Sequence, residues 1–285
     1  MNDFIAQLLE ITQYTFLRRG LAVGMLVTLC AALLGVTLVL RHYSMIGDGL
    51  SHIGFGALAV AAAFQWAPLP VALPAVMLSA FLLLHDGKGA RKLRGDAAVA
   101  IFSTSCLALG VLILSFRGGS NVDLMNYMFG SILSLTQNDL WLSLALSAVV
   151  LPGFLWFFHR IFSLTFDPSF ARATGVKTQA YQLFTAGLTA LTVVLGMRMM
   201  GTLLISSLMI FPALIAMRVC KSFRGVAVCA ALVAAACFVI GFVLSCTVRR
   251  GLPTGATIVV TNLCAFGIFA VAGRIRWRNR THCGD

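Results

Sequence analysis

Hydrophobic residues fall into long runs that short clusters of charged residues and glycines separate. A helix needs about 20 apolar residues to cross the hydrocarbon core of a bilayer, and most of these runs approach that length. Two of these runs are short, and only a few residues near 198–201 separate one run from the next, so a count of eight spans also fits. The pattern predicts an all-α polytopic membrane protein with about nine spans, at residues 20–40, 45–66, 68–84, 96–116, 139–158, 180–198, 201–219, 226–247 and 254–273.

Composition supports this assignment. The 285 residues are 60% hydrophobic and 11% charged, whereas soluble domains carry about 25% charged residues. The predicted helices are rich in small residues, including many of the 26 glycines, which lets helix backbones approach closely inside a membrane. We therefore expect one compact transmembrane domain over 20–273, an amphipathic segment on the membrane surface over 1–19, and a basic cytoplasmic tail over 274–285.

The excess of basic residues predicts an orientation. The chain has a net charge of +12. Cytoplasmic loops of membrane proteins are enriched in Lys and Arg, and this enrichment explains the charge, so we expect no nucleic-acid partner. With nine spans and the N-terminus outside, 15 of the 21 basic residues lie inside. This asymmetry predicts an outside N-terminus and an inside C-terminus. The six basic residues left outside are Arg18, Arg19, Arg117, Arg198, Arg249 and Arg250.

An acid and an imidazole stand at the start of the second span, in "MIGDGLSHIGFG" (45–56). Asp48 and His52 are four residues apart, so they share one helix face. An ionisable group at the centre of a span costs at least ~2.5–3.5 kcal/mol, so it indicates a function. The pair suits a divalent metal such as zinc or a proton relay. Alternatively, Asp48 caps the helix and His52 packs beside it. The surrounding glycines indicate an irregular or tightly packed helix.

A second candidate is the segment "SLTFDPSFARATGVKTQAY" (163–181) in the longest predicted cytoplasmic loop. Asp167 before Pro168 is typical of a helix start, with an N-cap and a proline at the first position. Gly175 is placed to end the helix. The residues predict a short capped helix, which either connects two spans or carries a function.

The remaining segments give weaker predictions about function. The eight cysteines occur singly, so we expect packing roles rather than disulfides. His282 and Cys283 offer a weak metal-binding hypothesis in the tail. Residues 121–135 predict an interfacial helix or a re-entrant turn. No phosphate-binding loop or hydrolase motif is present in the sequence, so we expect a transport protein that does not hydrolyse ATP itself, rather than an enzyme.

Taken together, five segments carry a resemblance to a known family. The chain resembles the membrane permease of ATP-binding-cassette importers for zinc, manganese or iron, and looks closest to the zinc branch. It departs from the commoner family residues at Gly49 and at "GFG" (54–56). The segments are "RHYSMIGDGLSHIGFGALAV" (41–60), "VDLMNYMFGSILSLTQNDLW" (122–141), "FDPSFARATGVKTQAYQLF" (166–184), "GMRMMGTLLISSLMIFPALIAMRVCKSF" (196–223) and "LPTGATIVV" (252–260).

The resemblance implies a homodimeric permease in the cytoplasmic membrane of a bacterium. Its implied partners are a pair of cytoplasmic ATP-binding subunits and an extracytoplasmic metal-binding protein. No cofactor is bound permanently, and the transported divalent metal is zinc, with manganese or iron as the alternative. Asp48 and His52 match the family's pathway residues. The helix at 166–177 matches the element that couples to the ATPase, through Asp167, Ala171, Arg172 and Gly175.

A proton-coupled secondary transporter would also use an acid and a histidine inside the membrane. Such transporters usually contain internal repeats with discontinuous helices. No convincing internal repeat is visible in the sequence, so the importer permease is the favoured interpretation.

Overall fold

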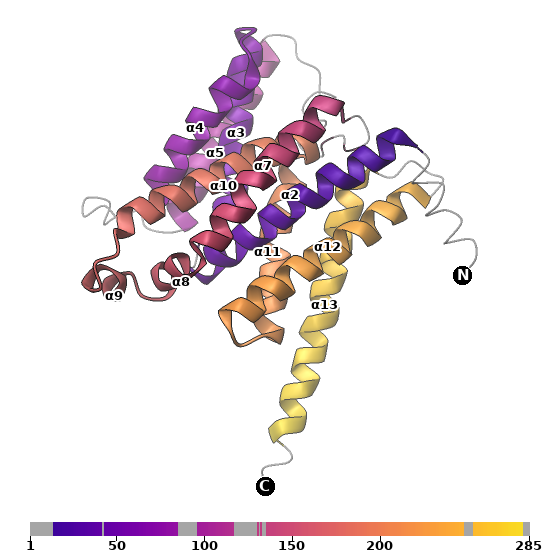
Figure 1. The fold of residues 1–285 in the computed structure, drawn as a ribbon. Helices are drawn as coiled ribbons and strands as arrows, with labels where there is room; N and C mark the ends of the chain where they lie inside the picture. Colours follow the sequence, from indigo (N-terminus) through magenta and orange to yellow (C-terminus); the bar gives the residue numbers. More distant parts are fainter. Residues whose placement is uncertain are drawn as a thin grey trace.

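The computed structural model describes residues 14–41, 43–84, 96–116, 130, 132, 135–247 and 253–281, and within these ranges the chain is helical (Figure 1). Eight of the described helices are long and apolar enough to cross a membrane, and α4 is a shorter apolar helix. The helices are α2 (Thr15–Leu40), α3 (Ile46–Ala63), α4 (Pro68–Leu84), α5 (Asp96–Phe116), α7 (Gln137–Trp156), α8 (Phe158–Phe166), α9 (Pro168–Ala173), α10 (Thr178–Met200), α11 (Thr202–Val219), α12 (Phe223–Thr247) and α13 (Thr254–Thr281).

Each of the nine predicted apolar runs corresponds to one helix, and the differences lie at the ends of the chain. The first helix begins at Thr15, inside the predicted surface segment 1–19, whose residues 1–13 lie outside the described part. The last helix continues to Thr281, so most of the predicted tail over 274–285 has helical backbone. Most of the segment 121–135, together with His282 and Cys283, also lies outside the described residues.

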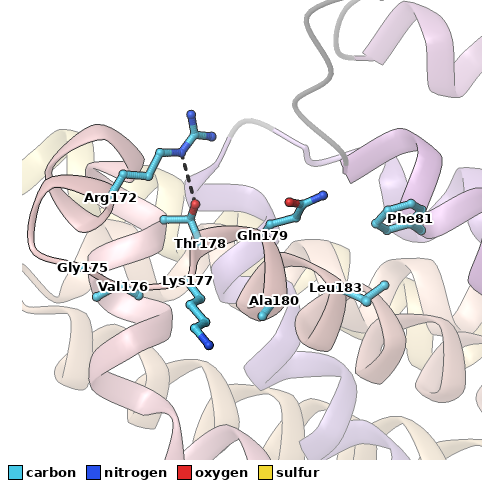
Figure 2. Close-up of a pocket in the computed structure, with 9 residues that line it drawn as sticks. All are labelled: Phe81, Arg172, Gly175, Val176, Lys177, Thr178, Gln179, Ala180 and Leu183. Carbon is cyan, nitrogen blue, oxygen red and sulfur yellow. Dashed lines mark hydrogen bonds between the residues drawn. The ribbon is translucent and has the colours of Figure 1, made fainter.

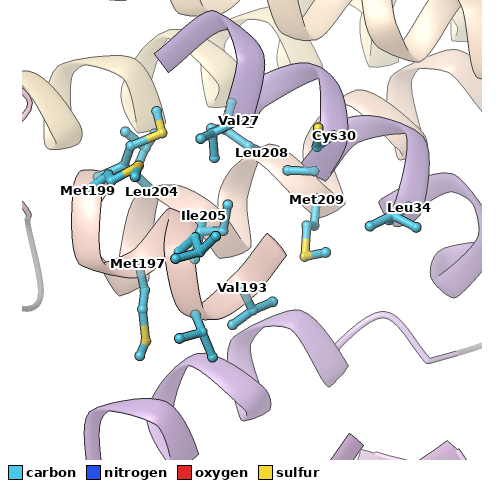
Figure 3. Close-up of a cluster of buried hydrophobic side chains, with 14 of the residues drawn as sticks. Val27, Cys30, Leu34, Val193, Met197, Met199, Leu204, Ile205, Leu208 and Met209 are labelled. Carbon is cyan, nitrogen blue, oxygen red and sulfur yellow. The ribbon is translucent and has the colours of Figure 1, made fainter. Parts of the chain in front are cut away.

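The core of the molecule lies around α2, α10 and α11. In α2 and α10, 72% of the most apolar window is buried, against 17% in α5 and α13. Figure 3 shows aliphatic and methionine side chains from the three inner helices in contact, among them Val27, Met197 and Leu208. The outer helices therefore turn most of their apolar surface outward, as a lipid-facing helix does.

Glycines bring pairs of helices into backbone contact. A Cβ atom on Gly35 of α2 would collide with the backbone of Met209 in α11, and one on Gly56 of α3 would lie 2.7 Å from the carbonyl oxygen of Cys106 in α5. A backbone neighbour cannot rotate away as a side chain can. Close approach through small residues, predicted from the sequence, is therefore confirmed.

One glycine separates α10 from α11. Gly201 has φ 90° and ψ 159°, a backbone conformation that is almost restricted to glycine. Helix α10 ends at Met200 and α11 begins at Thr202, so the tight join predicted near 198–201 is a break between two helices. Pro212 lies inside α11 without ending it.

A cluster of aromatic rings attaches α8 to the start of α12. Phe158, Phe162 and Phe166 of α8 lie 4.9, 5.3 and 6.1 Å from the ring of Phe223, measured between ring centroids. The sequence pattern did not predict α8 as a separate helix. It matters for the site because α9 follows it directly and takes its position from it.

Candidate functional site

Asp48 and His52 lie in the first two turns of α3. The helix begins at Ile46, and Asp48 occupies its first turn, where the partial positive charge of the helix N-terminus favours a carboxylate. The Oδ2 atom of Asp48 lies 3.4 Å from the Nε2 atom of His52. The two side chains are 29% and 16% exposed respectively, so the pair is recessed but still open to its surroundings.

The Asp48 carboxylate has a polar neighbour on another helix, and part of the His52 imidazole is unpaired. The Ser51 hydroxyl donates to the backbone carbonyl oxygen of Asp48 at 2.7 Å. Ser206 of α11, whose hydroxyl donates to the Leu203 carbonyl oxygen at 3.1 Å, lies near the Asp48 carboxylate. The Nδ1 atom of His52 is buried and has no hydrogen-bond partner among the described residues. A buried nitrogen without a partner costs about 1–3 kcal/mol, so this imidazole has capacity to interact with a further group.

The spacing of the two side-chain atoms is that of a long ion pair, and it is also compatible with two ligands of one metal ion. An N–H···O hydrogen bond usually measures about 2.7–3.2 Å. Oxygen and nitrogen ligands of a tetrahedral zinc ion, at about 2.0–2.2 Å from the metal, lie about 3.3–3.5 Å apart. The measured 3.4 Å falls in that range. No group of three or more His, Cys, Asp or Glu side chains that could hold a metal ion is found in the described residues, so Asp48 and His52 stand as a pair.

The glycines of α3 serve packing rather than an irregular backbone. The helix is continuous from Ile46 to Ala63. A Cβ on Gly47 would lie 2.7 Å from the sulfur of Met209, and one on Gly54 would meet the end of the Met197 side chain. The tightly packed alternative therefore holds, and the irregular alternative is wrong. These contacts fix the rotation of α3 and with it the direction of the Asp48–His52 face.

The second candidate, α9, has the local structure that its sequence predicts. The Asp167 carboxylate accepts hydrogen bonds from the backbone N–H groups of Ser169 and Phe170, both at 2.9 Å, and Pro168 is the first helical residue. Gly175 has φ 81°, the left-handed conformation that commonly ends a helix. The prediction of a short helix with these limits is confirmed.

The four residues expected to couple to an ATPase lie in different environments. Asp167 caps α9, and Ala171 is fully buried, so its methyl group packs within this chain instead of facing outward. Arg172 donates from Nε to the Thr178 hydroxyl at 3.1 Å (Figure 2). A Cβ on Gly175 would have no atom within 4 Å. The outward surface of α9 includes Phe170, whose side chain is 62% exposed.

Sequence reasoning missed two of these residues. Ser206 stands in the apolar segment "LLISSLMIF" (203–211), where two adjacent serines inside a span were a signal of a polar contact. The exposed Phe170 had no signal of its own, because its exposure depends on how α9 packs against α8 and α10.

Known proteins resemble the chain along most of its length. The sequence model of the ABC 3 transport family matches residues 13–273. The manganese import system permease protein ScaB of Streptococcus gordonii is 28% identical over 268 residues, which cover 94% of this chain and 95% of that protein. The high-affinity zinc uptake system membrane protein ZnuB of Haemophilus influenzae is 32% identical over 206 residues, which cover 71% and 77%.

A solved structure has the same arrangement of helices. PsaBC from Streptococcus pneumoniae in complex with Fab contains a chain that superposes with a TM-score of 0.81. The identity is 26%, and the alignment covers 94% of each chain. Family, relatives and fold therefore agree from α2 to α13.

Proposed function

Because the chain belongs to the ABC 3 transport family, we propose that it is the permease subunit of an ATP-driven importer that moves zinc across the cytoplasmic membrane of a bacterium. It is a multi-pass transport subunit rather than an enzyme. Relatives named for manganese and for zinc support a divalent metal as the cargo. The permease role is carried by the family match over residues 13–273, and the metal-ligand role by the separation of 3.4 Å between Asp48 Oδ2 and His52 Nε2 inside an apolar helix.

The ligand chemistry favours zinc within this class. Imidazole nitrogen suits zinc, whereas manganese is held more often by carboxylates, carbonyls and water. A twofold axis between two copies would duplicate Asp48 and His52. Two oxygens and two nitrogens then complete a tetrahedral zinc site, and two carboxylates offset the charge of an ion that is costly to desolvate. Because both side chains stay partly exposed, the site is suited to transient binding.

The energy for transport comes from separate ATP-binding subunits in this proposal. The sequence contains no phosphate-binding loop of its own. The capped helix α9 directly follows α8, and the exposed side chain of Phe170 offers an apolar contact there. We assign α9 as the element that docks on the ATPase. An extracytoplasmic protein delivers the metal to the opposite face.

Zinc uptake by two variants tests the ligand assignment. We expect Asp48→Asn and His52→Ala each to lose most uptake, normalised to the amount of assembled permease–ATPase complex, because each removes one metal ligand per chain. Asp139→Asn and His159→Ala are matched controls. Asp139 belongs to a capping box with Thr136, and His159 contacts Arg224 on the exposed surface. Near-normal uptake by both Asp48→Asn and His52→Ala would refute the assignment.

The identity of the cargo needs its own measurement. We expect ATP turnover by the complete complex, with its metal-binding protein, to be stimulated more by zinc than by manganese or ferrous iron. Stronger stimulation by manganese or iron would identify that metal, instead of zinc, as the cargo. The permease assignment would survive that result, because it rests on family and fold.

A further inference from the structure

A pocket lies at the junction of α9, α10 and the end of α4. Its volume is about 630 Å³, and its lining includes Phe81, Arg172, Thr178, Gln179 and Leu183. Figure 2 shows the Arg172 guanidinium and the Gln179 amide on the same side of the start of α10, with the ring of Phe81 beyond them. The pocket therefore has a polar, cationic end and an apolar end.

An apolar groove continues from this pocket between α4 and α10. It has a volume of about 490 Å³ and is lined by Leu73, Met77, Gly187 and Leu191, among others. The pocket and the groove share Ala180 and Leu183. A Cβ at Gly187 would meet only the terminal carbon of Met77, at a van der Waals distance of 3.4 Å, so this wall of the groove has room for a small side chain.

The groove has the length of one leaflet of a bilayer. From Ala180 to Leu191 a helix rises about 16 Å at 1.5 Å per residue. Half of the hydrocarbon core of a bilayer measures about 15 Å. An acyl chain that starts at the pocket would therefore reach the middle of the membrane along this groove.

We propose that the pocket and the groove together bind one anionic phospholipid, with its phosphate at Arg172 and Gln179 and one acyl chain between α4 and α10. Arginine presents a planar fork of donors that matches a phosphate group. The bond from Arg172 Nε to Thr178 at 3.1 Å holds that fork in place. Anionic lipids of the cytoplasmic leaflet are attracted to basic groups close to the membrane surface.

This site joins α9 to the bilayer. Arg172 is the last-turn basic residue of α9, while the groove belongs to α4 and α10, so a single lipid would contact all three helices. The site does not depend on which metal is transported. It is separate from Asp48 and His52, neither of which lines the pocket or the groove.

Native mass spectrometry of the purified permease–ATPase complex tests the proposal, with phosphatidylglycerol and phosphatidylcholine as probes. We expect the complex to retain phosphatidylglycerol in preference to phosphatidylcholine. Arg172→Gln should weaken phosphatidylglycerol binding about 10-fold, since it removes a charge-assisted contact. Gly187→Phe should also weaken binding, because Gly187 lines the groove and a ring there would occupy it.

Lys221→Gln is the matched control. It removes the same charge from the exposed turn between α11 and α12, and Lys221 lines neither the pocket nor the groove, so binding should persist. Equal retention of the two lipids, or unchanged binding in both Arg172→Gln and Gly187→Phe, would overturn the proposal. Displacement of phosphatidylglycerol by millimolar inorganic phosphate would also overturn it, because the site would then recognise a free anion. Loss of all lipid from the wild-type complex would overturn it as well.

Discussion

At the scale of single residues, the absence of a Cβ atom decides how closely helices approach. Gly56 faces the backbone carbonyl of Cys106, whereas Gly187 faces an open groove. Both residues lie in helix interiors, where alanine is favoured over glycine by about 1 kcal/mol. The same substitution should therefore have opposite effects at the two positions.

We expect Gly56→Ala to lower the unfolding temperature of the purified permease and Gly187→Ala to leave it unchanged or raise it. At Gly56 the added methyl group would lie 2.7 Å from a backbone oxygen, and overpacking of this kind typically costs about 1–3 kcal/mol. Thermal unfolding in detergent, followed by loss of the monodisperse peak, measures the difference. Equal unfolding temperatures for the two variants would contradict the close contact between α3 and α5.

At the scale of elements, α9 shows how local residues define a helix whose role depends on its surroundings. Six residues are too few for a stable isolated helix, so the cap at Asp167 and the packing of Ala171 hold it. The burial of Ala171 has a practical consequence: a large residue there would disturb the fold of the loop and would not report on docking.

The cap therefore gives the cleaner experiment. We expect Asp167→Ala to reduce metal-stimulated ATP turnover and transport together, because loss of an N-cap costs about 0.5–2 kcal/mol and loosens α9. Asp167→Asn is the matched control, since asparagine caps helices as well as aspartate does. Full transport by both Asp167→Ala and Asp167→Asn would contradict this prediction, because α9 would then couple to the ATPase without its N-cap.

At the scale of the whole molecule, the alternation of the nine apolar helices places α9 and the end of α13 on one face and the α3–α4 turn on the other. The charge asymmetry of the loops predicts that the face with α9 is cytoplasmic. The turn between α3 and α4 is exposed at Ala67, and the end of α9 is exposed at Thr174.

Labelling in intact cells tests this orientation. A membrane-impermeant maleimide should modify Ala67→Cys and should leave Thr174→Cys unmodified until the cells are opened, with the parent chain as the background for its native cysteines. Modification of Thr174→Cys alone in intact cells would reverse the orientation, and with it the assignment of α9 to the ATPase.

Much of this architecture could be predicted from the sequence because it depends on local properties. The length of each apolar run sets a span, so the ends of α4, α5 and α11 agree with prediction to within a residue. The limits of α9 follow from Asp167, Pro168 and Gly175. In contrast, α8 escaped prediction because His159 and Arg160 end the apolar run and place the residues after 158 in the predicted cytoplasmic loop, whereas in the structure only a turn at Phe157 separates α8 from α7.

The sequence by itself determined the number of long apolar helices and most of their limits, the four-residue spacing of Asp48 and His52, and the caps of α9, since each depends on residues within a few positions of one another. Only the tertiary structure decided that Ser206 lies against Asp48, that Ala171 turns inward, and that α4 and α10 leave a groove between them. These contacts join residues as much as about 160 positions apart. They depend on which helix faces pack together, and an apolar membrane helix carries little periodic signal to say which face that is.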